Sequence, residues 1–155
     1  MNLLVPSRFY VTSGKAVSEV SELNAFDRAL CDAGIAEYNL VPVSSVLPAK
    51  AQRIKSLQLP RGAILHCVLA QMHGDEGETI SAGIAYAFRK DGQGGYVAEG
   101  HGHLEMKAMK EILGWKMSEM ASFRGIELKP VRYLIEELSV SMDHYGACIA
   151  ALALI

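Results

Sequence analysis

Two adjacent serines, Ser44 and Ser45, stand near the end of the apolar segment 39–48, which reads NLVPVSSVLP. Such a pair permits one unusual reaction. The hydroxyl of Ser45 can attack the carbonyl carbon of Ser44 and shift the acyl group from nitrogen to oxygen. Elimination from the resulting ester would break the chain and convert residue 45 into a pyruvoyl group. The step needs a strained peptide, an oxyanion donor and a buried site. By itself, a serine pair here is also typical of an ordinary strand end.

Three further polar residues have ordinary interpretations when they are judged by residue type alone. Asn39 precedes the apolar segment and suits a turn, and Glu99 ends a short strand, where an exposed carboxylate is common. Asp27 lies near the start of a predicted helix and could act there as a cap. None of these residues indicates a reaction without a partner.

The histidines and cysteines show no metal-ligand pattern. His66 and Cys67 are neighbours in a predicted strand and therefore point to opposite faces of its sheet. No two of the three cysteines form a C-x-x-C pair, and the pair His101 and His103 has no evident further ligand. We expect no metal site and no disulfide framework.

The composition indicates one folded domain spanning residues 1–155. Half of the residues are hydrophobic and 21% are charged, which supports a sizeable core. A formal net charge of −2 argues against a nucleic-acid-binding protein, because such proteins are usually basic. The N-terminus shows no secretory signal, and the apolar run 147–155 is far shorter than the roughly 20 residues that span a bilayer. We expect a cytoplasmic protein with no membrane partner.

The periodicity of the chain predicts about six or seven strands and two main helices, an α+β protein. The helices are predicted over 22–33, with Asn24 as N-cap, and over 104–123, with one row through Leu104, Ile112 and Trp115. The last two predicted strands, 133–142 and 147–155, flank a hairpin-like turn. The other strands are predicted at 8–12, 39–48, 62–72, 78–88 and 96–99.

The chain resembles the pyruvoyl-dependent arginine decarboxylases of archaea and some bacteria. The matching pieces occur in the family's order and span nearly the whole chain. They are LNAFD at 23–27, AGI at 33–35, NL at 39–40, VSSVLP at 43–48, GA at 62–63, GETISA at 77–82, YVAEG at 96–100 and GAC at 146–148. No single piece is decisive, but the ordered set is specific.

This resemblance implies a fold, a cofactor and a reaction. The fold would be a compact four-layer αββα sandwich that assembles into homotrimers, or dimers of trimers, with active sites between subunits. The chain would cleave itself between Ser44 and Ser45 into residues 1–44 and 45–155. The cofactor would be a covalent pyruvoyl group derived from Ser45, with no pyridoxal phosphate, and the reaction would convert L-arginine to agmatine and CO₂ through a Schiff base.

The resemblance also implies roles for individual residues. Ser45 would become the pyruvoyl group, and Glu99 would be the acid that protonates the α-carbon after decarboxylation, a role best served by an apolar, closed site. The amide of Asn39 would stabilise the oxyanion of the acyl shift. Asp27 would bind the cationic end of the substrate, and Ser44 would line the pocket with its new carboxylate.

The sequence departs from the family pattern in places. Gly100 and His101 stand where relatives can carry a second acid and an aromatic residue, and the segment before Phe9 is short. The resemblance therefore defines the reaction class more closely than the substrate. One alternative is the same chemistry on ornithine or lysine, and another is a trimeric scaffold of the same fold that does not process itself.

Overall fold

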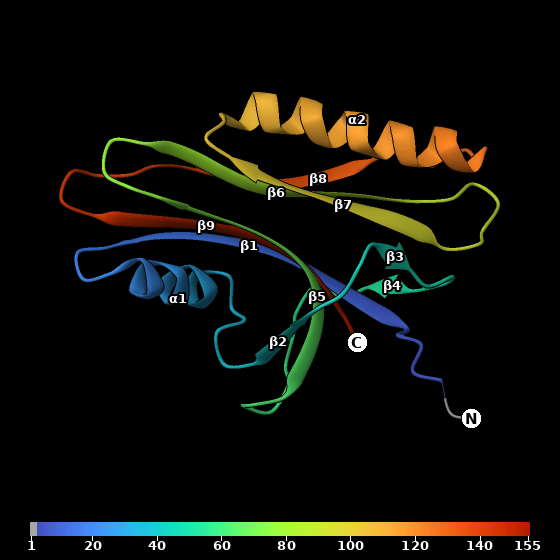
Figure 1. The fold of residues 1–155 in the computed structure, drawn as a ribbon. Helices are drawn as coiled ribbons and strands as arrows, with labels where there is room; N and C mark the ends of the chain where they lie inside the picture. The colour runs from blue at the N-terminus through green and yellow to red at the C-terminus, as the bar shows by residue number, and fades with distance from the viewer. Residues whose placement is uncertain (1–2) are drawn as a thin grey trace.

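The computed structural model describes residues 3–155, which form two β-sheets and two helices (Figure 1). The five-stranded sheet has the order β2-β5-β9-β1-β4. Its strands are β1 (Arg8–Ser18), β2 (Asn39–Pro42), β4 (Gln52–Arg53), β5 (Ile64–Gly74) and β9 (Tyr145–Leu154). β9 runs antiparallel to both β1 and β5, whereas the edge strands β2 and β4 run parallel to their neighbours.

The four-stranded sheet has the order β3-β7-β6-β8, and all of its pairings are antiparallel. Its strands are β3 (Val46–Leu47), β6 (Thr79–Phe88), β7 (Gly95–Gly102) and β8 (Arg132–Ser139). The helices are α1 (Glu22–Asp32) and α2 (Met106–Arg124). The α+β class predicted from the sequence is confirmed.

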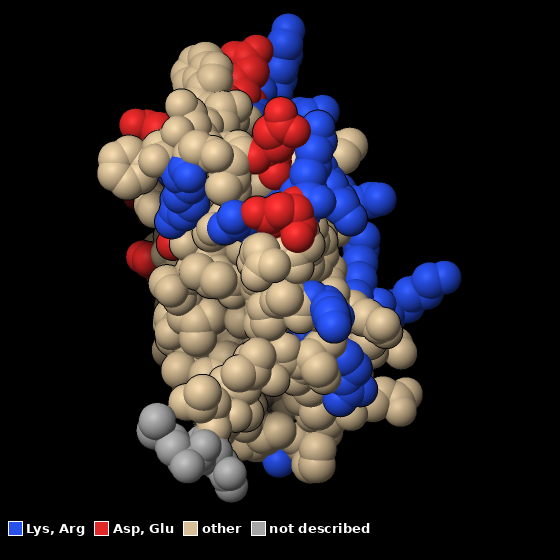
Figure 2. All heavy atoms as spheres, turned by 90° about the vertical axis from the view of Figure 1, so that its right-hand side faces the viewer, with Lys and Arg blue, Asp and Glu red and all other residues tan. Residues whose placement is uncertain are grey.

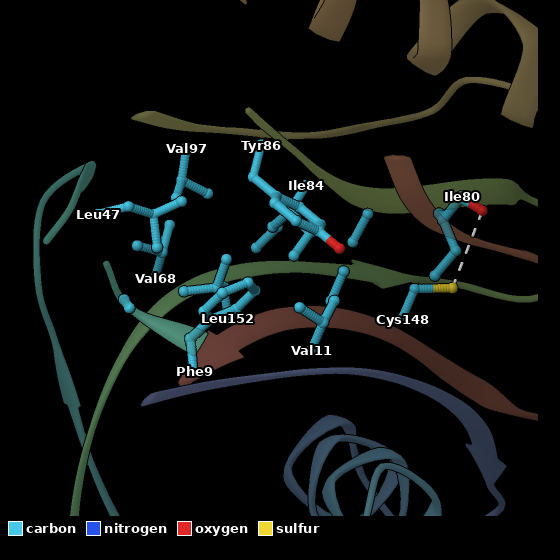
Figure 3. Close-up of a cluster of buried hydrophobic side chains, with 14 of the residues drawn as sticks. Phe9, Val11, Leu47, Val68, Ile80, Ile84, Tyr86, Val97, Cys148 and Leu152 are labelled. Carbon is cyan, nitrogen blue, oxygen red and sulfur yellow. Dashed lines mark hydrogen bonds between the residues drawn. The ribbon is translucent and has the colours of Figure 1, made fainter. Parts of the chain in front are cut away.

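Three apolar clusters show how these elements pack. The first lies between the two sheets and includes Phe9, Ile84 and Leu152 (Figure 3). The second joins α1 to the five-stranded sheet, and the third joins α2 to the four-stranded sheet. The two helices therefore cover the outer faces of different sheets, as Figure 1 shows.

The sequences of the central strands follow from this arrangement. In both β6 and β9 every residue except the two at the ends is buried. A strand that is covered on both faces needs apolar residues at all positions, not at alternate ones. Many of these residues are alanines. Their small side chains allow a helix or the other sheet to pack closely on the strand.

The predicted hairpin near the C-terminus is wrong. β8 pairs with β6 in one sheet, whereas β9 pairs with β1 and β5 in the other. Between them Val140 is buried in the cluster between the sheets, and its N–H donates to the carbonyl of Glu78. The chain therefore crosses from one sheet to the other at this point, which local turn residues alone do not reveal.

Both helices differ in detail from their predictions. The N-cap of α1 is Ser21, whose side chain accepts from the N–H of Asn24, so Asn24 is not the cap. In α2 the buried positions are Met109, Leu113 and Met117, while Trp115 is exposed. The helix therefore packs on the sheet through a different row from the one predicted, with flexible methionines on that face. Among residues 3–155, no helix combines the length and apolar character needed to cross a membrane.

Candidate functional site

The segment with the two serines passes from one sheet to the other. The N–H of Val43 donates to the carbonyl of Cys67 in β5 at 3.0 Å, and the carbonyl of Ser45 accepts from the N–H of Val97 in β7 at 2.9 Å. The Ser44–Ser45 peptide lies between these two hydrogen bonds. Each side of that peptide is thus attached to a different sheet.

Two prolines explain why the predicted strand 39–48 is split. Pro42 ends β2, an edge strand, where a residue without an N–H is tolerated. Pro48 directly follows β3, which has only two residues. Gly94, with φ of 94°, allows the turn before β7 to approach this segment, since a Cβ there would lie 2.5 Å from the carbonyl oxygen of Leu47.

A cavity of about 440 Å³ brings Ser45 and Glu99 together, although 54 positions separate them in the sequence. One wall consists of β7 residues, and the other comes from the second half of α2. Its lining residues are Ser45, Val97, Ala98, Glu99, Lys116, Glu119, Met120, Phe123 and Arg124. Two of the predicted catalytic residues therefore share one space.

The cavity is open because β3 is short. β3 pairs only with Gly95 and Tyr96, so the outer edge of β7 beyond Val97 has no partner strand among residues 3–155. Glu99 lies on this open stretch and is exposed. The closed, apolar surroundings predicted for Glu99 are absent within one protomer.

Two cationic side chains of α2 contact residues of β7 at this cavity. Lys116 donates from Nζ to the backbone carbonyl of Glu99 at 2.7 Å. The guanidinium of Arg124 lies 4.4 Å from the centre of the Tyr96 ring, a cation–π contact. Arg89 donates to the hydroxyl of Tyr96 and to Asp91, and its hydrogen bond lowers the pKa of the Asp91 carboxyl.

Glu99 also acts electrostatically on the neighbouring sheet. Burial is the main cause that raises the pKa of the Cys67 thiol to about 11, and the negative charge of Glu99 adds to it. Cys67 belongs to β5, the strand on which β2 pairs just before the serines. The charge of Glu99, a residue of the four-stranded sheet, therefore affects a side chain of the five-stranded sheet.

Asn39 does not line this cavity. It begins β2, opposite Ile64, and its side-chain Nδ2 donates to the carbonyl of Gly62 at 2.8 Å. Ser44 is exposed and precedes the cavity-lining Ser45 directly.

Asp27 lies on a different side of the protomer. It is an exposed residue of α1, beyond the first turn, so the alternative of a capping role at the helix start is wrong. α1 packs on β1 and β9, whereas the cavity lies between β7 and α2 (Figure 1). Within one chain the two cannot meet the same substrate.

Sequence reasoning missed the cavity residues of α2. Lys116, Met120 and Phe123 follow one another at helical spacing, and Phe123 is 90% exposed. An apolar residue near the C-terminal end of a helix, beside the stripe that packs on the sheet, was the available signal. The part of the chain that the structure describes has no group of three His, Cys, Asp or Glu side chains suited to a metal ion.

Comparisons with known proteins identify the family of this chain. The family model described as pyruvoyl-dependent arginine decarboxylase matches residues 8–155. A protein of that name from Pyrococcus abyssi is 34% identical, with 86% of each chain covered. One from Methanothermobacter thermautotrophicus is 32% identical over 96% of this chain and 97% of its own length. A third, from Thermococcus kodakarensis, is 33% identical over 99% and 98%. The chain therefore belongs to the pyruvoyl-dependent arginine decarboxylase family, enzymes whose cofactor is a covalent pyruvoyl group.

Proposed function

We propose that this enzyme decarboxylates L-arginine to agmatine and CO₂ in the cytoplasm, through a Schiff base on a pyruvoyl group formed from Ser45. The observation that carries the proposal is the shared cavity of Ser45 and Glu99. It joins a serine, from which a pyruvoyl group can form, with a carboxyl group able to deliver a proton.

The proposed processing step cuts the chain between Ser44 and Ser45. Residues 1–44 would then contain β1, α1 and β2, and residues 45–155 would contain all the other elements. β1 pairs with β9 from Phe9 to Ser18, and β2 pairs with β5. These backbone hydrogen bonds favour two pieces that stay folded together as a single domain.

The residues around position 45 suit a pyruvoyl group. Such a group supplies a ketone that condenses with the substrate amine and a conjugated carbonyl that accepts the electrons released with CO₂, as pyridoxal phosphate does in other enzymes. The carbonyl of residue 45 stays on the C-terminal side of the cut, so Val97 continues to donate to it. That N–H orients the carbonyl and stabilises negative charge on it.

Two other residues are assigned steps in the same proposal. Glu99 would return a proton to the α-carbon once CO₂ has left. Asn39 would stabilise the oxyanion of the acyl shift. Its Nδ2 carries two hydrogens, of which the contact with Gly62 uses one, so one hydrogen remains available to donate.

Asp27 would bind the guanidinium of the substrate from a neighbouring protomer. A carboxylate can accept two parallel hydrogen bonds from this group. Because α1 and the cavity lie apart within one chain, Asp27 needs a second copy to reach the cavity. The open edge of β7, the exposed Glu99 and the exposed Phe123 favour a site that a second copy closes. We therefore propose a homotrimer, or a dimer of trimers, with Ser44 near the shared pocket.

The same proposal includes the four-layer αββα sandwich of the family. It is supported by the three apolar clusters, one between the sheets and one beneath each helix. In that arrangement the two helices form the outermost layers, where α1 and α2 of different copies can meet.

Product analysis tests the proposed function. The purified protein is incubated separately with arginine, ornithine and lysine, and amines and CO₂ are measured. We expect two chains by intact mass and agmatine as the main product. Ornithine or lysine as the better substrate would move the assignment to the alternative decarboxylase. A single uncut chain with no amine product would favour the non-processing scaffold and overturn the proposal.

A further inference from the structure

A second cavity lies away from Ser45. Its volume is about 660 Å³, within the range of about 300–1,000 Å³ that small-molecule sites usually occupy. Residues of β1, β4, β6 and β8, with the segment before β8, line it, and neither Ser45 nor Glu99 takes part. It opens between an edge of the five-stranded sheet and an edge of the four-stranded sheet.

Two exposed arginines line this cavity from facing sheets. Arg53 in β4 lies opposite Phe9, and Arg132 in β8 lies opposite Tyr86. Residues directly opposite on paired strands share one face of their sheet. Phe9 and Tyr86 belong to the cluster between the sheets, and their rings meet edge to face with centres 5.7 Å apart (Figure 3). The arginines therefore stand on the same sides of the two sheets as this cluster, but on the edge strands β4 and β8, where both are exposed.

Arg53, Lys129 and Arg132 are exposed at the opening of this cavity, so each remains in contact with water. Like charges gathered at one opening repel each other. Among residues 3–155, Arg53, Lys129 and Arg132, which all line the cavity, take part in no ion pair with a carboxylate. An anion in the cavity would offset their mutual repulsion.

The cavity also holds a polar group suited to an anion and an apolar surface for the rest of a ligand. The Tyr86 side chain is 4% exposed, and its hydroxyl accepts from Nη1 of Arg53 at 3.2 Å. The hydroxyl can still donate its own proton. Phe9 and Phe88, whose ring centres are 5.9 Å apart, supply the apolar surface. Figure 2 shows Lys and Arg side chains gathered along one side of the face at this end of the sheets.

We propose that this cavity is a second binding site, which takes a small organic anion with an apolar body. A carboxylate or phosphate group would lie between Arg53 and Arg132, with Lys129 at the rim, and the apolar body would pack on Phe9 and Phe88. The cationic side chain of arginine does not suit these charges, so the ligand is not the substrate.

Titration calorimetry of the full processed assembly tests this site with phenyl phosphate as the probe. We expect saturable binding of one molecule per protomer. Inorganic phosphate, which lacks the apolar body, and phenol, which lacks the charge, should each bind about tenfold more weakly or worse. Arg53→Gln and Arg132→Gln should each weaken phenyl phosphate binding about tenfold or more, because a charge-assisted hydrogen bond is lost.

Two control variants locate the site. Lys107→Gln removes an equal charge from an exposed position on α2 and should leave the affinity unchanged. Arg124→Gln removes a charge from the Ser45 cavity and should also leave it unchanged. Circular dichroism confirms that the variants are folded. No binding of phenyl phosphate, equal binding of inorganic phosphate, or a loss caused by Arg124→Gln instead of the two cavity arginines would overturn the proposal.

Discussion

The backbone N–H of Val97 donates to the carbonyl oxygen of Ser45 at 2.9 Å, across the boundary between β3 and the open edge of β7. This bond lies immediately after the Ser44–Ser45 peptide and belongs to the part of the chain that a cut there would leave intact. It holds residue 45 in the cavity that Glu99 also lines.

Replacement of Ser45 by alanine should abolish processing, because the nucleophile of the acyl shift is its hydroxyl. Intact mass spectrometry should show two pieces, 1–44 and 45–155, for the native sequence and one chain for Ser45→Ala. Ser44→Ala is the matched control, since residue 44 supplies only its carbonyl, and it should still be cut. Cleavage of Ser45→Ala at the same bond would exclude the proposed mechanism.

Replacement of Glu99 by glutamine should leave processing intact and slow turnover. Loss of a positioned acid typically costs about 10²–10⁴-fold in kcat. Agmatine release under saturating arginine measures the effect, and intact mass confirms the two chains. Glu111→Gln, an equal charge change at an exposed position of α2 outside the cavity, should remain within about twofold of the native rate. An unchanged rate for Glu99→Gln would remove this residue from the mechanism.

Mixed assemblies should show that Asp27 acts on a neighbouring copy. Asp27→Asn and Ser45→Ala protomers should each be nearly inactive alone. When the two are co-expressed, an Asp27→Asn protomer keeps its cavity and can receive an intact Asp27 from a Ser45→Ala neighbour. With random mixing, about a quarter of the interfaces would combine both intact residues.

The control for this mixture pairs Ser45→Ala with Glu99→Gln. Because Ser45 and Glu99 line the same cavity of one protomer, that mixture has no complete site and should not recover. Recovery in the control, or its absence in the test mixture, would contradict a site shared in this way.

Two buried thiols should make the stability fall in alkaline solution. Burial raises the pKa of Cys67 to about 11 and that of Cys148 to about 12, from an ordinary value of 9.0. Because the folded pKa is higher than the unfolded one, this stability is fully present below pH 9 and is lost as the pH rises toward 11–12.

Urea unfolding between pH 8 and 11 measures this dependence, and Cys67→Ala should reduce its slope. Iodoacetamide at pH 8 should label the exposed Cys31 in the folded protein and spare the buried Cys67 and Cys148. Rapid labelling of either buried cysteine in the folded state would contradict the pKa directions.

Replacement of Gly14 by alanine should destabilise the contact between β1 and α1. A Cβ at Gly14 would lie 2.3 Å from the carbonyl oxygen of Ala29 and 2.8 Å from the nitrogen of Ala33, both backbone atoms of or next to α1. Such overpacking costs about 1–3 kcal/mol or more. Gly102→Ala is the control, because its Cβ would make only ordinary contacts with the Leu104 side chain. Equal midpoints in urea for both variants would show that α1 can move away at little cost.

Much of the fold could be predicted from local patterns. The long strands and both helices can be predicted because their apolar periodicity is a local feature. The glycine that ends a helix is local too, as with Gly125, which has a left-handed φ at the end of α2. The partner of each strand could not be predicted in the same way. Val140 reads as part of one strand of a hairpin, yet it is buried where the chain crosses between the sheets.

By itself the sequence determined the family, the α+β class and the residues able to form a pyruvoyl group, because these depend on residue types in a fixed order. The tertiary structure decided which of them meet. It places Ser45 beside Glu99, separates Asp27 from both, and adds Lys116 and Arg124 to the cavity wall. It also places two exposed arginines at an opening between the edges of the two sheets. Strand pairing and sheet packing bring together residues far apart in the chain, and no local pattern encodes those distances.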